Sequence, residues 1–511
     1  MDDTSRLAGR SEWAGLAVLA LPTLLVSMDM SILFLATPSL SAALRPGSAE
    51  LLWISDIYGF LLAGALIPMG AIGDRIGRRK LLLLGALAFG LVSGLAALAT
   101  TPAMLVGARA LLGIAGATLL PSTLALIRNM FTNARQRSIA IGVWTTCFTL
   151  GGVLGPIVGG LLLEFFWWGS IFLIGIPIML LLLLLGPICL PEFVERTGFP
   201  YDLLGIGQSM ASLLALTFAL KQFAEHGLTV MAGLSLMAGL TAGRLFLRRQ
   251  RRLDAPLVDL GLFRNAAFST ALAANSLALF AWVGASLLVA QYLQLVMGLS
   301  PLSAGLWTVP AAAGSVAGCL GAAALSKYFP PSRVACGALL LTTTGLAVMA
   351  LPPGSFGLGV LISGMVLLGI GVAAVVTLAT DLVLAAAPAE KAGAAAAISE
   401  TGADLGGSLG VAVFGSIGIA AYRALIVAPA GLDPRDVESA RDTLGGALDI
   451  AAGLSAAAGD QLRASAQSAF TSGFGLAMAA GAAILLTSTV LFAWAALRWN
   501  EKQRSRPATE N

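Results

Sequence analysis

Acidic side chains inside long apolar segments are the residues of this sequence best suited to do chemistry. Five acids fall within stretches that otherwise carry almost no charge: Asp29, Asp56, Asp381, Glu400 and Asp404. An ionised carboxylate is costly in hydrocarbon, so an acid in such a segment is expected to face a cavity and to bind protons or cations. A single arginine, Arg109, lies within another apolar segment.

Asp29 is the first candidate for a proton acceptor, because it lies about fifteen residues into its apolar segment, past the membrane midplane. Arg109 reaches a comparable depth. An arginine beside a carboxylate favours the ionised form until a proton or a cation competes. We expect Arg109 to tune either Asp29 or Asp56, and the sequence leaves that choice open. The alternatives are a structural ion pair, a helix–helix hydrogen bond for Asp29, and a hydrated, structural role for Asp56.

Glu400 and Asp404 are four residues apart, so they share one face of a helix. Two carboxylates on a partly dry face cannot both be ionised at low cost, so the pair is expected to hold either a proton or an organic cation. We expect both residues to bind substrate or to couple it to protons. Asp381 lies near the cytoplasmic end of its segment, where a structural or gating role is expected.

Aromatic side chains offer cation–π contacts to bulky, delocalised cations, each worth roughly 0.5–2 kcal/mol. The alternative for any one of them is ordinary packing or a place at the membrane interface. The candidates are Trp53, Tyr58, Trp144, Phe148, Phe280, Trp282 and Trp307.

These residues sit in a chain whose composition excludes a soluble domain. Of its 511 residues 58% are hydrophobic and 11% charged, whereas soluble domains carry about 25% charged residues. The apolar blocks are near the roughly 20 residues that cross a bilayer as a helix. We therefore predict an all-α integral membrane protein with fourteen transmembrane helices, at 14–38, 51–72, 81–99, 103–127, 138–162, 168–190, 203–221, 228–247, 268–296, 303–325, 334–351, 356–384, 393–421 and 470–497.

The distribution of basic residues predicts the orientation. Twenty-three of the 30 Lys and Arg residues fall in connections on the side of both termini, and six on the opposite side. Positive loops stay in the cytoplasm, so both termini are expected there. Residues 248–267 form a basic cytoplasmic linker, and residues 423–469 are predicted as an external loop with weak helical patterning. Neither connection is expected to form a domain with its own core.

An internal repeat divides the chain. Gly113 and Ile114 align with Gly369 and Ile370 at a shift of 256 residues, and the same shift places Gly151 on Gly407. Parallel halves related by an axis along the membrane normal are typical of one large class of secondary transporters. We predict six-helix halves in residues 1–200 and 251–511, with two inserted helices in residues 201–250.

Several function classes are excluded. The four cysteines lack metal-ligand spacing and His226 is the only histidine, so no metal site is expected. No G-x-x-x-x-G-K-[ST] motif, nucleophile–base constellation or other cofactor site is present, so neither ATP-driven pumping nor enzyme activity is expected. The net charge of +4 is too small to indicate nucleic-acid binding.

Several motifs together resemble the major facilitator superfamily. GAIGDRIGRRK at 70–80 resembles its cytoplasmic loop signature, LVGARALLGIAG at 105–116 its fourth-helix motif with Arg109, and WTTCFTLGGVLGPIVGG at 144–160 the fifth-helix motif of antiporters. SMDMSILFLATPSL at 27–40 and AGAAAAISETGADLGGSLG at 392–410 resemble motifs of the fourteen-span drug:proton antiporter branch, which contains multidrug efflux pumps. The motifs are spread over nearly the whole chain.

The resemblance implies proton-driven export of lipophilic cations such as ethidium, acridine dyes and quaternary ammonium compounds, with fluoroquinolones as a further candidate class. It implies a bacterial cytoplasmic (inner) membrane protein, expected as a monomer, powered by the proton gradient without a cofactor. Relatives that handle dications well can carry an acid in the tenth helix, and residues 303–325 contain none. Export of an endogenous metabolite or an antibiotic by the same fold is the alternative.

The resemblance also assigns conformational roles to two motifs. The loop motif is implied to latch the halves in one facing state, through Gly70, Gly73, Asp74, Arg75, Gly77, Arg78 and Arg79. The fifth-helix motif is expected to permit a kink and close helix packing, through Gly151, Gly155, Pro156, Gly159 and Gly160.

Overall fold

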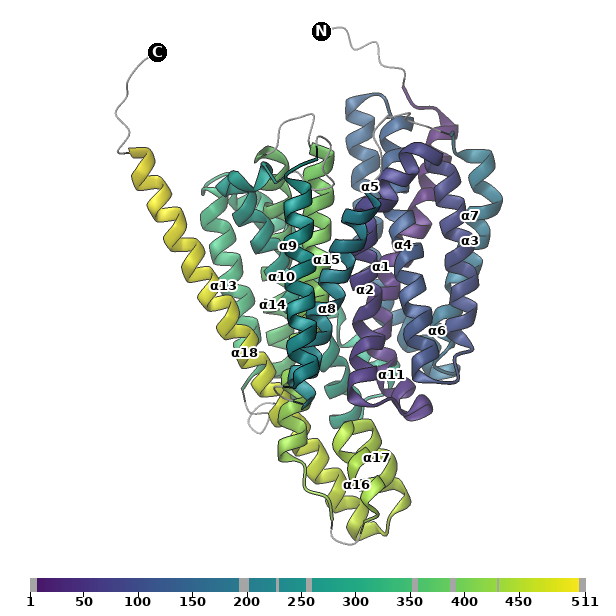
Figure 1. Cartoon of the computed structure of the whole chain (residues 1–511), viewed down its shortest axis with the longest axis vertical. Coiled ribbons are helices and arrows are strands. Elements are labelled where there is room, and N and C mark those ends of the chain that lie inside the picture. The colour runs from purple at the N-terminus through teal and green to yellow at the C-terminus, as the bar shows by residue number, and fades with distance from the viewer. Residues whose placement is uncertain are drawn as a thin grey trace.

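The structure is a computed structural model that describes residues 7–192, 202–226, 229–253, 260–351, 357–386, 392–429 and 432–504. Over these residues the chain is a bundle of helices without a β-strand (Figure 1). Helices satisfy every backbone N–H and C=O internally, which hydrocarbon demands. The first helix begins and the last helix ends at the same end of the bundle, opposite α16 and α17.

The first helices of the chain form one group, within which α6 and α7 together make one span. They are α1 (Arg10–Leu44), α2 (Ser48–Ile76), α3 (Arg78–Ala97), α4 (Pro102–Met130), α5 (Ala134–Phe165), α6 (Ser170–Leu173) and α7 (Gly175–Cys189). Two further helices follow, α8 (Leu203–His226) and α9 (Val230–Gln250).

The remaining helices form a second group and a segment (residues 423–469) that lies at one end of the bundle (Figure 1). They are the short η1 (Leu262–Arg264), α10 (Ala266–Gln291), the π-helical η2 (Tyr292–Val296), α11 (Pro301–Leu306), α12 (Val309–Leu325), α13 (Pro331–Met349), α14 (Gly357–Ala386), α15 (Ala392–Leu425), α16 (Pro434–Asp442), α17 (Leu444–Gly453) and α18 (Ala456–Arg504). The π-helical η2 continues α10, and α11 and α12 together form one span.

Fourteen helical segments correspond to the fourteen predicted spans. Among the described residues, thirteen are long and apolar enough to cross a membrane, and α8 contains a shorter apolar stretch, Leu204–Leu216. The all-α membrane fold is thereby confirmed. The domain boundaries at residues 200 and 250 stay a prediction.

The two groups pack their helices in the same pairs. In the first group α1 packs against α5 and α4 against α2 and α3, and in the second α10 packs against α15 and α14 against α12 and α13. Glycines permit the first of these contacts in each group: Gly151 lies against the Leu24 carbonyl oxygen of α1, and Gly406 against the Ser276 carbonyl oxygen of α10.

Helices α8 and α9 are joined by hydrogen bonds where α8 begins and α9 ends. Asp202 accepts hydrogen bonds from the Gly205 N–H (2.7 Å), Arg249 Nε (2.5 Å) and Gln250 Nε2 (2.8 Å). Burial alone would raise the pKa of Asp202, but these bonds and the Arg249 charge hold it below its usual range. The ionised Asp202 carboxylate therefore joins the two helices.

We expect Asp202→Asn to lower the stability of the fold at pH 7 by about 1–3 kcal/mol, because it weakens three buried hydrogen bonds to a charged group. The pKa is lower in the folded chain, so the carboxylate stabilises the fold above its unfolded-state pKa. This contribution is lost as the pH falls through the lower folded-state pKa, below about pH 4. Thermal unfolding of both proteins at pH 7 and pH 3 measures the effect.

The control is Asp460→Asn, which removes an exposed carboxylate that pairs with Arg463 at 3.4 Å within α18. Its melting temperature should equal that of the parent at both pH values, because exposed pairs contribute little. A melting-temperature difference for Asp202→Asn that persists unchanged at pH 3 would contradict the assignment.

Residues 423–469 are more helical than the sequence indicates. The structure gives α16 and α17 there, and α18 begins at Ala456, well before the predicted start at residue 470. Ala440, Leu444, Ala447 and Leu462 are buried in this segment and join the apolar cluster of the second group. Its Ala- and Gly-rich composition gives a weak periodic signal, and tertiary packing supplies the stability that short helices lack in isolation.

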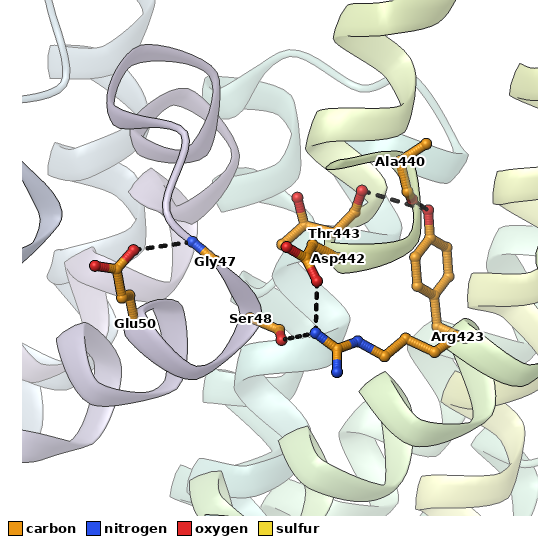
Figure 2. Close-up of polar contacts among 8 residues, drawn as sticks. Gly47, Ser48, Glu50, Arg423, Ala440, Asp442 and Thr443 are labelled. Atoms are coloured by element: carbon orange, nitrogen blue, oxygen red, sulfur yellow. Dashed lines mark hydrogen bonds and ion pairs between the residues drawn. The ribbon is translucent and has the colours of Figure 1, made fainter. Parts of the chain in front are cut away.

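Polar contacts tie residues 423–469 to both groups of helices (Figure 2). Arg423, at the end of α15, donates to Asp442 (2.5 Å) and to the Ser48 hydroxyl of α2 (2.8 Å). Arg45, between α1 and α2, pairs with Asp449 of α17 at 2.8 Å. The Tyr422 hydroxyl donates to the Ala440 carbonyl oxygen at 2.8 Å. The two groups are therefore joined at the end that carries α16 and α17.

Candidate functional site

Arg109 pairs with Asp29 inside the first group of helices. Arg109 Nη1 lies 2.5 Å from Asp29 Oδ2, and the two side chains are 1% and 7% exposed. Arg109 Nε also donates to the Ile54 carbonyl oxygen at 3.4 Å, and its guanidinium lies 4.4 Å from the Tyr58 ring centroid. Of the two partners that the sequence left open for Arg109, the structure selects Asp29.

Two glycines of α4 bring α2 close enough to build this cluster. A Cβ at Gly113 would meet the Tyr58 carbonyl oxygen at 2.5 Å, and one at Gly116 would meet the Tyr58 hydroxyl at 3.1 Å. Small residues at a helix contact allow such an approach in lipid. Gly113 and Gly116 therefore allow the Tyr58 ring to pack against Arg109.

Asp56 lies on a different face of α2. It is 2% exposed, and it precedes Tyr58 by two residues, which turns it about 200° around the helix. Gly59 of the same helix faces Ser408 of α15, whereas Gly64 faces Met210 of α8. Asp56 falls between these two contacts on the helical wheel, away from Arg109.

Glu400 and Asp404 lie on α15, near the face that turns to α2. The α15 residues Ser408 and Gly415 contact Gly59 and Leu52 of α2. Asp404 precedes Ser408 by one turn and Glu400 by two, which puts both acids near this face, toward the end of the bundle that holds the chain termini. Both are half-buried.

Asp404 is also only partly satisfied. Its Oδ2 is buried and has no hydrogen-bond partner within the described part of the chain. Glu400 and Asp404 act on each other electrostatically. An acidic pair at a helix seam with an unpartnered oxygen is suited to bind a proton or a cation.

The aromatic candidates occupy different surroundings. Trp144 and Phe148 of α5 are half-buried and stack at 6.2 Å, and Trp144 Nε1 donates to Thr123 Oγ1. Phe280 is buried against Phe414 with ring centroids 5.4 Å apart. Trp282 is partly buried against the core of the second group, and Trp307 is 41% exposed. Among the described ring contacts, the two candidates that pair with each other are Trp144 and Phe148.

The loop motif at residues 70–80 is held in place by Glu192, a residue that the sequence motifs do not include. Glu192 accepts from the N–H groups of Arg79 (3.0 Å) and Lys80 (3.2 Å), at the start of α3. A carboxylate at a helix N-terminus is favoured by the helix dipole. Gly77 has φ +108° and a Cβ there would overlap Glu192, so glycine is required. The only sequence signal was an acid directly after a predicted span.

The other loop residues are placed as follows. Gly73 lies against the Arg78 side chain, and Gly70 lies near Pro121 of α4. Arg75 is exposed, and Asp74 is helical in α2, but its side chain lies outside the described part. Contacts that join this loop to the second group of helices are not among those described, so its latching role stays a prediction.

The fifth-helix motif lies at two helix contacts. Gly155 and Gly159 face α1, where a Cβ would overlap Ser31 and Ile32. Gly160 faces the backbone of Pro301 and Leu302, and the Pro156 carbonyl oxygen lies against Gly305. The motif thus packs α5 against α1 and against α11 of the second group.

Asp381 is exposed on α14, and no described contact joins it to the other candidate acids. Among the described residues no group of three His, Cys, Asp or Glu side chains could hold a metal ion.

A bundle whose two groups of helices pack alike, with a charged pair in its core, is the architecture of a secondary transporter. The chain belongs to the Major Facilitator Superfamily, whose family model matches residues 19–411. Family and fold both point to a multi-pass membrane transporter and not to an enzyme.

Individual relatives cover nearly the whole chain. It is 42% identical to the multidrug efflux pump LfrA of Mycolicibacterium smegmatis over 96% of this chain and 97% of LfrA. It is 34% identical to the methyl viologen resistance protein SmvA of Salmonella typhimurium, over 94% and 97%. These relatives place the chain in the drug-efflux branch of the superfamily.

A solved structure supports the fold. A bacterial homologue of the human lysosomal transporter Spinster, in an inward-facing and unoccupied conformation, superposes with a TM-score of 0.70 at 18% identity. The match covers 98% of this chain and all of that one.

Proposed function

We propose that this chain is a proton-coupled antiporter that exports lipophilic organic cations, such as ethidium, acridine dyes and quaternary ammonium compounds. The observation that carries the proposal is the acidic pair on α15, where Asp404 Oδ2 is buried and has no hydrogen-bond partner among the described residues. Arg109 is the one buried Lys or Arg among residues of described burial, and Asp29 already pairs with it. The interior therefore favours a cationic substrate.

The proposed mechanism is alternating access with competition between a proton and the substrate. On the acidic outer side, protonation neutralises Glu400 or Asp404 and releases the cation outward. On the inner side, loss of the proton restores the negative charge that binds the next cation. In a low dielectric the charge change is large enough to bias which end of the bundle is open.

The observed contacts support a cytoplasm-facing state. Arg423, Arg45 and Gly160 join the two groups at the end that carries α16 and α17. The basic connections lie at the other end, so we propose that the closed end is external and both termini are cytoplasmic. We further propose a monomer in the bacterial cytoplasmic membrane, powered by the proton gradient alone, without a cofactor.

The test uses proteoliposomes with an imposed pH gradient and ethidium as substrate. Glu400→Gln and Asp404→Asn are each expected to lower gradient-driven ethidium flux at least tenfold. Each variant removes a charged contact with the bound cation, and a contact with a charged group is worth about 1.5–3 kcal/mol. Glu164→Gln is the matched control, since Glu164 is an exposed acid near the end of α5. Its flux should equal that of the parent.

Equal flux in all three variants would contradict the site assignment. Absence of ethidium flux in the parent protein would favour export of an endogenous metabolite or antibiotic. A dication such as methyl viologen is expected to be transported less efficiently than ethidium, because Pro301–Leu325 contributes no acid.

A further inference from the structure

Two complementary polar atoms in the interior have no hydrogen-bond partner among the residues that the structure describes. The Tyr58 hydroxyl of α2 is a hydrogen-bond donor, and Asp404 Oδ2 of α15 is an acceptor. Tyr58 is 1% exposed. Each buried, unsatisfied group costs about 1–3 kcal/mol, and native structures rarely retain one without a reason.

The two atoms belong to helices that pack against each other. Gly59, the residue after Tyr58, contacts Ser408, which follows Asp404 by one turn of α15. The donor and the acceptor therefore lie near one contact between α2 and α15, and a sliding or rotation of these helices against each other changes the distance between the two atoms.

The Tyr58 ring also contacts Arg109 of the first group of helices. The Arg109 guanidinium lies 4.4 Å from its centroid, and Arg109 holds Asp29. A Cβ at Gly116 would lie 3.1 Å from the Tyr58 hydroxyl, so the phenol packs closely against α4. Tyr58 thus touches the acid–base pair of the first group, while the next residue of α2, Gly59, contacts the helix that carries the acids of the second.

We propose that in the opposite facing state the Tyr58 hydroxyl donates a hydrogen bond to the Asp404 carboxylate. Tyr58 is then a positioning residue that connects the Asp29–Arg109 pair to the acidic pair of α15. The bond forms only when the two groups change their relative arrangement, so it stabilises the state that is not seen here. This inference rests on the proposed alternating access, but not on the identity of the substrate.

The experiment measures conformational populations by double electron–electron resonance and needs no transport. Spin labels are placed at the exposed Asn129 and Lys327, at the ends of α4 and α12. The native cysteines are replaced by alanine. In the parent protein two distance populations are expected, one for each facing state.

Tyr58→Phe keeps the ring over Arg109 and removes only the donor, so it is expected to shift the population ratio about tenfold toward the state seen here. Asp404→Ala should shift it in the same direction. The double variant should shift it no further than either single variant, because both remove one bond. Tyr292→Phe is the control, since Tyr292 packs against Phe474 in the second group, and it should leave the ratio unchanged.

The proposal is overturned if Tyr58→Phe has the parent's ratio, or if the shifts of the two single variants multiply in the double variant. If the proposed substrate or proton coupling is wrong, ethidium flux fails while these populations still respond. The two failures are therefore distinguishable.

Discussion

Asp29→Asn is expected to abolish ethidium efflux driven by a pH gradient, because it removes the carboxylate that pairs with Arg109 in the interior. Breaking one side of a buried ion pair costs about 3–5 kcal/mol, since it leaves a charge without compensation. Because no acid remains beside Arg109 to accept a proton, gradient-driven flux should fall to the level of protein-free liposomes. Asp29→Glu should retain part of the activity, because it keeps an acid beside Arg109. Initial rates of flux in proteoliposomes measure the effect.

A double variant separates a transport role from a structural one. Asp29→Asn combined with Arg109→Gln removes both charges, so the melting temperature should recover toward that of the parent. Gradient-driven flux should stay lost, because no proton acceptor has been restored. Recovery of flux together with stability would show that the pair serves only to hold α1 and α4 together.

Gly151→Ala is expected to give the second large effect, by forcing α1 away from α5. A Cβ at Gly151 would overlap the Leu24 carbonyl oxygen and lie 3.0 Å from Ser27 Cβ. Overpacking of this kind costs about 1–3 kcal/mol. Asp29 follows Ser27 by two residues, so the displacement also disturbs its geometry toward Arg109. Both the melting temperature and gradient-driven flux should fall.

Its neighbour supplies the control. A Cβ at Gly152 would meet only Ser27 Oγ, at 3.5 Å, which is ordinary van der Waals contact. Gly152→Ala should therefore match the parent in stability and flux. If the two alanine variants behave alike, the close approach of α1 and α5 at Gly151 is not what the motif provides.

The sequence predicts the acids and the arginine of the interior but not how they pair. Hydropathy fixes the depth of a residue along its span, and Asp29 and Asp56 both lie at depths that Arg109 could reach. The partner depends on which face of each helix is turned inward. Gly113 and Gly116 set that face for α2 by contacting Tyr58, and no periodicity in an almost wholly apolar helix reports it.

Tyr58 and Glu192 illustrate two further limits. Tyr58 is expected from sequence only as an aromatic surface for a substrate, whereas its ring lies against Arg109. Glu192 is separated by 113 residues from the Arg79 N–H that it binds, so only the packing of α7 beside α3 brings the two together. Contacts of this kind depend on tertiary structure and leave no local pattern.

The spans themselves are well predicted, because length and apolarity alone define a helix in a bilayer. The helices of residues 423–469 are not, since Ala- and Gly-rich helices such as α17 lack a strong amphipathic period. Their contacts with Ser48 and Arg45 connect both groups at one end of the bundle. Opening of that end during transport requires these contacts to break.

The proposed exchange of a cation for a proton is tested most directly by using an ethidium gradient to drive proton movement. Purified protein is reconstituted into liposomes that contain a pH-sensitive dye, and an ethidium gradient is imposed without a pH gradient. Antiport requires that ethidium movement in one direction drives protons in the other, so the interior pH should change and the change should vanish in Asp404→Asn. If the parent protein transports ethidium across these membranes without a change of interior pH, the account is contradicted.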